Sequence, residues 1–212
     1  MGCLLLHLHL LILSCFLSSS RAELKSGVGI NYGQLGNNLP QPPHAVELIQ
    51  HTLKASRVKI YDANPDILRA LGGTGLEVSM QLPNELIAAA ASNQSFSDEW
   101  VRSNVALFYP KTRIRYILIG NEVLSNQDII RVWPDVVPAM ERVQRSLKAQ
   151  KITAVKVTTS LGIDVLESSL VFPPSNATFR ADISGRIIKP MLEFLRRTGS
   201  VVFLDVYPFF HW

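Results

Sequence analysis

A glutamate that follows a run of apolar residues is the strongest candidate for chemistry in this sequence. Glu122 comes directly after the apolar run Tyr116-Ile117-Leu118-Ile119 and the pair Gly120-Asn121. A carboxyl group held above apolar side chains is partly shielded from water, which raises its pKa and lets it keep a proton near neutral pH. Asn121 offers both a donor and an acceptor to a hydroxyl group of a ligand. The pair predicts a general acid beside a polar binding group, although a helix-capping or surface glutamate without a role would give the same spacing.

The elements that must hold Glu122 in place alternate between short apolar runs and longer helical patterns. The short runs are rich in Val, Ile and aromatic residues, as is typical of strands buried on both faces of a parallel sheet. They are Val28–Tyr32, Arg57–Tyr61, Leu76–Leu82, Ile114–Ile119, Ala154–Ser160 and Val201–Val206. The helical patterns are Pro43–Ala55, Asp66–Leu71, Asn84–Ala91 with Asp98–Phe108, Asp128–Gln150, and Asp182–Arg197. We expect one helix to begin at Ser97-Asp98-Glu99, because a hydroxyl and two acids suit a helix N-terminus.

Alternating strands and helices predict an α/β protein with a parallel sheet. An open doubly wound sheet would suit a nicotinamide-dependent oxidoreductase, but Gly27-Val28-Gly29 is followed by a polar, proline-containing loop instead of a helix. A (β/α)8 barrel of the TIM type fits better, because polar and aromatic residues follow the strand ends, where barrel enzymes keep their sites. These residues are Tyr32, Asp62, Asn121, Glu122 and Tyr207. About six β/α units are present.

The first 22 residues predict a secretory signal peptide. Leu4 to Leu17 is almost entirely apolar, and Ser18-Ser19-Ser20-Arg21-Ala22 is a small-residue stretch suited to cleavage. The run is short for a membrane span, which needs about 20 residues. No Lys or Arg precedes it, so a retained anchor is the alternative. We expect a signal peptide over residues 1–22 and one domain over residues 23–212, without a transmembrane span in the mature chain.

Two glycosylation acceptors are consistent with this route. They are Asn93-Gln94-Ser95 and Asn176-Ala177-Thr178. We expect a secreted glycoprotein of the extracellular space, the cell wall or the outer face of the plasma membrane.

Composition excludes several classes of site. Cys3 and Cys15 both lie in the signal peptide, so the mature chain has no disulfide, thiolate nucleophile or cysteine zinc site. His44 and His51 are seven residues apart, which is not the spacing of a helical zinc pair. We expect neither a metal nor a cofactor. The net charge of +4, which becomes +3 without Arg21, is spread along the chain and predicts no nucleic-acid partner.

Four motifs resemble those of one enzyme family. They are Val28–Pro40 (VGINYGQLGNNLP), Val58–Pro65 (VKIYDANP), Ile119–Leu124 (IGNEVL) and Tyr207–Phe210 (YPFF), and Pro173-Pro174-Ser175 before Phe179-Arg180 also fits. In this order, over about residues 27–212, they resemble plant family 17 glycoside hydrolases, the endo-1,3-β-glucanases. The resemblance implies a retaining hydrolase on a (β/α)8 barrel that cleaves internal β-1,3-glucosidic bonds of callose-like glucans.

The same resemblance assigns roles to individual residues. Glu122 would be the catalytic acid/base, and Asn121 would bind the 2-hydroxyl of the sugar at the cleavage subsite. Tyr32 and Tyr207 match substrate-binding tyrosines of the cleft, although aromatic packing at the barrel rim is the alternative for both.

One part of the family's machinery is missing from the sequence. A retaining mechanism needs a second carboxylate about 5–5.5 Å from the first, and the family supplies it in a Glu-x-Gly-Trp-Pro motif that does not occur here. Asp62 and Asp205 are the nearest other acids in the pattern. Asp205 stands where the family more often has Asn, and we interpret it as an inward-facing, hydrogen-bonded acid.

We therefore expect a C-terminally truncated member of the family, a fragment that is inactive as written. The alternative is a non-catalytic cell-wall protein that binds glucan. A C-terminal lipid anchor in a full-length form is left open.

Overall fold

The computed structural model describes residues 27–167 and 174–207. The predicted signal peptide, 1–22, lies outside the described residues. The described part contains six parallel strands, and all six predicted strands are confirmed with ends shifted by a few residues. They are β1 (Gly29–Tyr32), β2 (Arg57–Ile60), β3 (Glu77–Leu82), β4 (Ile114–Asn121), β5 (Lys156–Gly162) and β6 (Phe203–Asp205).

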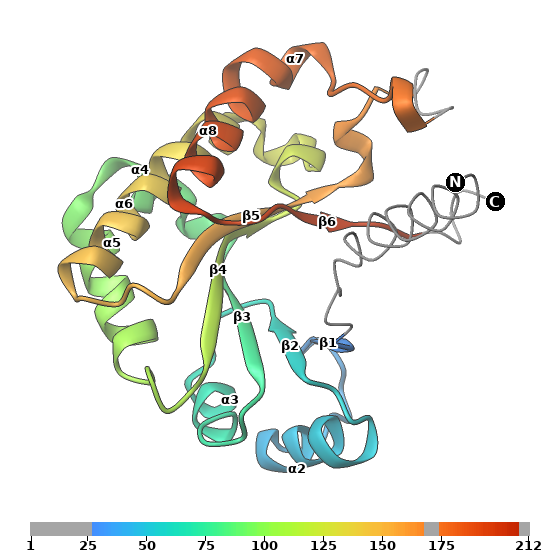
Figure 1. Cartoon of the computed structure of the whole chain (residues 1–212), viewed down its shortest axis with the longest axis vertical. Coiled ribbons are helices and arrows are strands. Elements are labelled where there is room, and N and C mark those ends of the chain that lie inside the picture. The colour runs from blue at the N-terminus through green and yellow to red at the C-terminus, as the bar shows by residue number, and fades with distance from the viewer. Residues whose placement is uncertain (1–26, 168–173, 208–212) are drawn as a thin grey trace, which may run out of the picture.

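The order of the strands decides between the two architectures. They pair in the order β1-β2-β3-β4-β5-β6, whereas a doubly wound sheet reverses its order at a switch point. The sheet is also strongly curled, as a contact between its second and last strands shows: Nζ of Lys59 in β2 lies 3.2 Å from Oδ1 of Asp205 in β6. Four strand spacings of a flat sheet would separate them by about 19 Å. The sheet is thus an arc of a (β/α)8 barrel, as predicted, with its helices on the outer side (Figure 1).

Helices connect the strands on the convex side of the arc. The α-helices are α2 (Pro42–Glu47), α3 (Pro65–Ala70), α4 (Ile87–Ser92), α5 (Gln94–Val101), α6 (Val136–Ala149), α7 (Ala181–Ile183) and α8 (Lys189–Thr198). Wider π-type turns are η1 (Leu48–Thr52), η3 (Arg102–Ala106) and η9 (Ser184–Ile188). Tighter 3-10 turns are η2 (Asn84–Leu86), η4 (Val123–Ser125), η5 (Gln127–Asp135), η6 (Ile163–Val165) and η8 (Pro174–Asn176).

One predicted helix start is wrong. Helix α5 begins at Gln94, and its N-cap is Asn93, whose Oδ1 accepts the backbone N–H groups of Ser95 at 2.9 Å and Phe96 at 3.4 Å. Ser97 lies inside the helix instead, where its buried hydroxyl donates to the carbonyl of Ala90. Asn is as good an N-cap as Ser. The helix therefore begins after Asn93 and is one turn longer than a helix capped by Ser97 would be.

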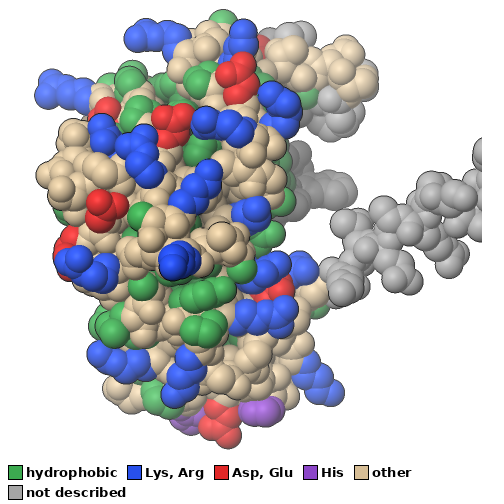
Figure 2. Space-filling view, turned by 60° about the vertical axis from the view of Figure 1, so that its left-hand side comes forward, with side chains coloured by type: hydrophobic (Ala, Val, Ile, Leu, Met, Phe, Trp, Pro, Cys, Tyr) green, Lys and Arg blue, Asp and Glu red, His purple; other side chains and the backbone are tan. Residues whose placement is uncertain are grey.

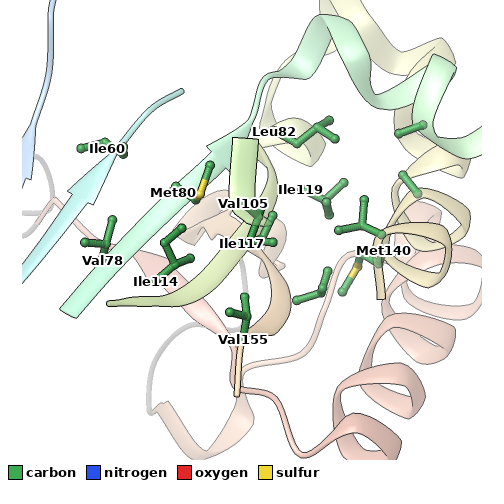
Figure 3. Close-up of a cluster of buried hydrophobic side chains, with 14 of the residues drawn as sticks. Ile60, Val78, Met80, Leu82, Val105, Ile114, Ile117, Ile119, Met140 and Val155 are labelled. Carbon is green, nitrogen blue, oxygen red and sulfur yellow. The ribbon is translucent and has the colours of Figure 1, made fainter. Parts of the chain in front are cut away.

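The core lies between the sheet and the helices (Figure 3). Strand residues such as Ile60, Met80 and Ile117 point outward and meet helical residues such as Val105 and Met140, all of them almost completely buried. Each such side chain contributes about 1.5–3 kcal/mol through burial of apolar surface. This layer provides the rigid base from which the strand ends project.

The outer surface carries charges of both signs. Figure 2 shows Lys and Arg side chains scattered among Asp and Glu over the helical face, as expected from their spread along the sequence. Within residues 27–167 and 174–207, no helix is long and apolar enough to cross a membrane.

Candidate active site

The backbone around Glu122 departs from ordinary strand geometry. Gly120 has a φ of +74°, and a Cβ there would lie 2.3 Å from Cγ2 of Val123 and 2.7 Å from Oδ1 of Asn84. Glu122 itself adopts the left-handed conformation, with φ 46° and ψ 38°. That conformation costs an L-residue about 1–2 kcal/mol, so the surroundings must hold it in place. Residues held in this way cluster at functional sites.

Two neighbouring chain segments hold this turn. Asn84, the first residue of η2 after β3, bonds both backbone groups of Asn121. Its Oδ1 accepts the N–H at 2.8 Å, and its Nδ2 donates to the carbonyl at 3.2 Å. From β5, the carbonyl of Ser160 accepts the N–H of Glu122 at 3.2 Å. The position of Glu122 is therefore fixed by the strands on both sides of β4.

The side chain of Asn121 has a defined orientation. Its Oδ1 accepts from the ammonium of Lys59 at 3.3 Å and from the hydroxyl of Ser160 at 3.1 Å. Its Nδ2 makes no hydrogen bond to any of the described residues and is thus the end that can donate to a ligand. The predicted binding amide therefore stands beside Glu122 as a donor.

The carboxyl group of Glu122 receives a hydrogen bond from Tyr207. The hydroxyl of this tyrosine lies 3.3 Å from Oε1. The pKa of Glu122 is raised above its ordinary value, chiefly by burial and next by the negative charge of Asp205, with a smaller contribution from Asp164. The hydrogen bond from Tyr207 and the charge of Lys59 lower this pKa without reversing the shift. Partial desolvation of this glutamate, predicted from the sequence, is the largest of these effects.

Two further residues of β2 and its end belong to this group of side chains. The Lys59 ammonium lies 5.1 Å from the centre of the Tyr61 ring. Burial raises the pKa of the Tyr61 hydroxyl, and the charges of Asp205 and Glu122 raise it further. The sequence predicted no role in the site for Lys59 or Tyr61. The pattern that could have located them is the alternation of Lys59 and Tyr61 with the apolar Val58, which places both on the concave face of the sheet.

Tyr32 lies elsewhere. It pairs in register with Ile60, is 8% exposed and belongs to the main hydrophobic cluster. The described contacts do not bring it to Glu122. The structure therefore gathers Glu122, Asn121 and Tyr207 but leaves Tyr32 in the helix-facing layer, and its role in ligand binding stays a prediction.

The other acids near the strand ends have structural partners. Oδ1 of Asp62 accepts the N–H of Asn64 at 3.0 Å in the turn after β2. Both carboxylate oxygens of Asp205 accept from Lys59, at 3.2 and 3.3 Å. The interpretation of Asp205 as an inward-facing, hydrogen-bonded acid agrees with this contact. In the described part of the chain, no group of three or more His, Cys, Asp or Glu residues could hold a metal ion.

Comparison with known proteins places this site in a family. The family described as "Glycosyl hydrolases family 17" matches residues 28–212. The chain is 47% identical over 191 residues to the "Probable glucan endo-1,3-beta-glucosidase A6" of Arabidopsis thaliana, which covers 90% of this chain. It is 35% identical over 211 residues to a "Glucan endo-1,3-beta-glucosidase" of Triticum aestivum, which covers 96% of it.

Solved structures give the same result. CJP38, a beta-1,3-glucanase and allergen of Cryptomeria japonica pollen, superimposes with a TM-score of 0.83 at 34% identity, over 87% of this chain and 57% of its own. A plant beta-glucan endohydrolase superimposes with a TM-score of 0.79 at 31% identity. The chain spans only 39% of the Arabidopsis protein and 45% of the wheat protein, about half the length of these curated relatives. On the match over residues 28–212, the chain belongs to glycosyl hydrolase family 17.

Proposed function

We propose that this chain carries the proton-donor part of an active site that cleaves β-1,3-glucosidic bonds in glucans. Glu122 is the general acid/base, and Asn121 donates through Nδ2 to a hydroxyl of the bound sugar. The observation that carries this proposal is the raised pKa of a glutamate held in a left-handed turn at a strand end. Relatives named glucan endo-1,3-beta-glucosidase support the choice of substrate.

The chemistry follows from the protonation state of Glu122. The protonated carboxyl group gives its proton to the glycosidic oxygen as the bond to the anomeric carbon breaks, and in a retaining hydrolase a second carboxylate bonds to that carbon. The Glu122 carboxylate then takes a proton from the water molecule that displaces the second carboxylate and releases the sugar. Tyr207 restrains the carboxyl group through Oε1, so the other oxygen is the one that faces the substrate. The hydrogen bond also supports the carboxylate after the proton has left.

The retaining mechanism needs a second carboxylate about 5–5.5 Å from the first. Glu-x-Gly-Trp-Pro does not occur in the 212 residues, and Asp62 and Asp205 both have structural partners. We infer that these residues provide the proton donor without the nucleophile and that they do not complete hydrolysis by themselves.

The experiment separates binding from cleavage. We expect the purified chain to bind laminaritriose more tightly than cellotriose, its β-1,4-linked control, in a calorimetric titration. Asn121→Ala should weaken the binding, whereas Glu122→Gln should preserve it. Equal affinity for the two trisaccharides would contradict the proposed substrate. Hydrolysis of laminarin by the chain, abolished by Glu122→Gln, would show that the site is complete.

A non-catalytic role in glucan binding is the second candidate, because the Glu-x-Gly-Trp-Pro motif does not occur in the 212 residues. The transcript beyond the codon of Trp212 distinguishes the two. A Glu-x-Gly-Trp-Pro segment there would support catalysis, and a longer frame without it would favour binding.

Secretion belongs to the same proposal. Asn93 and Asn176 are both exposed, as attachment of a glycan requires. The protein is secreted after removal of residues 1–22 and acts in the cell wall or at the outer face of the plasma membrane. N-terminal sequencing of the exported protein should begin at Glu23, and a mature protein that retains the leader would contradict this.

A further inference from the structure

The ion pair between Lys59 and Asp205 lies within the arc of strands. Their side chains are 10% and 19% exposed. The Lys59 ammonium contacts three acceptors: Oδ1 of Asn121 at 3.3 Å and the two carboxylate oxygens of Asp205 at 3.2 and 3.3 Å. A lysine ammonium has three donors and no acceptor. The protein itself therefore supplies three acceptors to this ammonium, two from Asp205 and one from Asn121.

Stability alone does not account for this pair. Desolvation of two charges offsets much of their attraction, and apolar residues of similar volume often replace a buried ion pair without loss of stability. The specific feature of this pair is its third contact, to Asn121.

The two donors that face Asn121 are not equivalent. A serine hydroxyl both donates and accepts, so Ser160 could bond either end of the amide. Lys59 can only donate, so it can bond the amide only when Oδ1 of Asn121 faces the ammonium, and it disfavours the flipped orientation. In the flipped orientation, Nδ2 would face the ammonium and Oδ1 would face the ligand.

We propose that Lys59, held by Asp205, is a positioning residue that fixes the amide of Asn121 so that Nδ2 points to the ligand. This inference rests on the proposed function, because it takes Asn121 as the group that binds a sugar hydroxyl. Lys59 acts through Asn121 and touches no reacting atom. Its removal should therefore weaken sugar binding only while Asn121 is present.

The test uses variants that keep the interior balanced in charge. Lys59→Met alone would leave Asp205 buried without its partner and could unfold the chain, so the main variant is Lys59→Met with Asp205→Asn. Lys59→Arg keeps a donor-only cation and should rescue the orientation. Ser160→Ala is the matched control, because it removes the donor that does not select an orientation. It also removes a contact of 3.4 Å between the hydroxyl oxygen and the N–H of Glu122, but it keeps the bond of 3.2 Å from this N–H to the Ser160 carbonyl.

We expect the charge-free double variant to bind laminaritriose about tenfold more weakly, the equivalent of one hydrogen bond. Lys59→Arg should stay within about threefold of the original affinity, and Ser160→Ala should lose less than the double variant. In an Asn121→Ala background, the same double substitution should cause no further loss. The proposal would be overturned if the losses of affinity from Asn121→Ala and from the double substitution added in full. It would also be overturned if the double variant bound laminaritriose as tightly as the original chain does.

A second measurement is independent of any sugar. The side-chain amide of Asn121 gives one pair of NMR resonances if its orientation is fixed, and we expect the double variant to broaden or duplicate them. An unchanged pair would overturn the proposal. If the original chain binds no laminaritriose, the proposed function fails, and the amide resonances still decide whether Lys59 orients Asn121.

Discussion

Substitution of Gly120 by alanine tests the account of how Glu122 is positioned. Gly120 has a φ of +74°, and the added Cβ would meet Cγ2 of Val123 at 2.3 Å and Oδ1 of Asn84 at 2.7 Å. Asn84 is the residue that holds both backbone groups of Asn121. The methyl group should therefore strain the turn and displace the residue that fixes it.

The expected loss of stability in Gly120→Ala is the sum of a conformational cost and a packing cost. The left-handed conformation costs an L-residue about 1–2 kcal/mol, and an extra methyl group in a packed site costs about 1–3 kcal/mol. Gly120→Ala should therefore lower the free energy of unfolding by about 2–5 kcal/mol. Domains are stable by about 5–15 kcal/mol, so the variant should remain folded enough to measure.

Alanine substitutions at two other glycines distinguish the conformational cost from the packing cost. Gly73 has a φ of +80° with no atom within 4 Å of the added Cβ, so Gly73→Ala should show the conformational cost alone, about 1–2 kcal/mol. Gly185 lies in the helical segment Ser184–Ile188 and also has open space, so Gly185→Ala should be neutral or stabilising by up to about 1 kcal/mol. Urea unfolding with a constant slope gives the three values. A loss in Gly120→Ala no larger than in Gly73→Ala would refute the role of packing around this turn.

Two further predictions concern the carboxyl group and the helix cap. Tyr207→Phe should raise the pKa of Glu122 further, because it removes a hydrogen bond that favours the carboxylate, whereas Asp205→Asn should lower it, because it removes a negative charge. Titration of the Glu122 carboxyl carbon by NMR measures both, and shifts in the same direction would contradict the assignment of causes. In unglycosylated protein, Asn93→Ala should cost about 1 kcal/mol through loss of the N-cap, whereas Asn93→Asp should keep the cap while removing the glycosylation acceptor. Urea unfolding compares them, and equal stability of the two variants would exclude a capping role.

The strands and the position of Glu122 were predictable because both depend on local pattern. A run such as Tyr116–Ile119 is too apolar for a surface strand, and the polar residues after it are expected near the barrel mouth. Helix starts were harder to predict. Asn93 and Ser97 are both good caps, and the choice between them depends on the packing of α5 against its neighbours.

The partners of Glu122 were less predictable because they depend on which side of the sheet each residue faces. Tyr32 ends β1 and Tyr207 follows β6, yet Tyr32 is in register with Ile60 in the outer layer while Tyr207 reaches Glu122. Lys59 and Asp205 are 146 positions apart, and no local pattern links them. Their contact depends on how far the sheet curls, which is a property of the whole arc.

The curl also resolves a conflict between two requirements of the site. A lysine fixes the amide of Asn121 because it cannot accept a hydrogen bond, but its positive charge favours the carboxylate form of Glu122 and so opposes proton storage. Asp205 binds the same ammonium and acts on Glu122 in the opposite direction. With the two charges opposed, burial remains the largest effect on Glu122, and its pKa stays raised. An uncharged pair at these positions would release the amide, and a lysine without Asp205 would fix the amide but lower the pKa of Glu122.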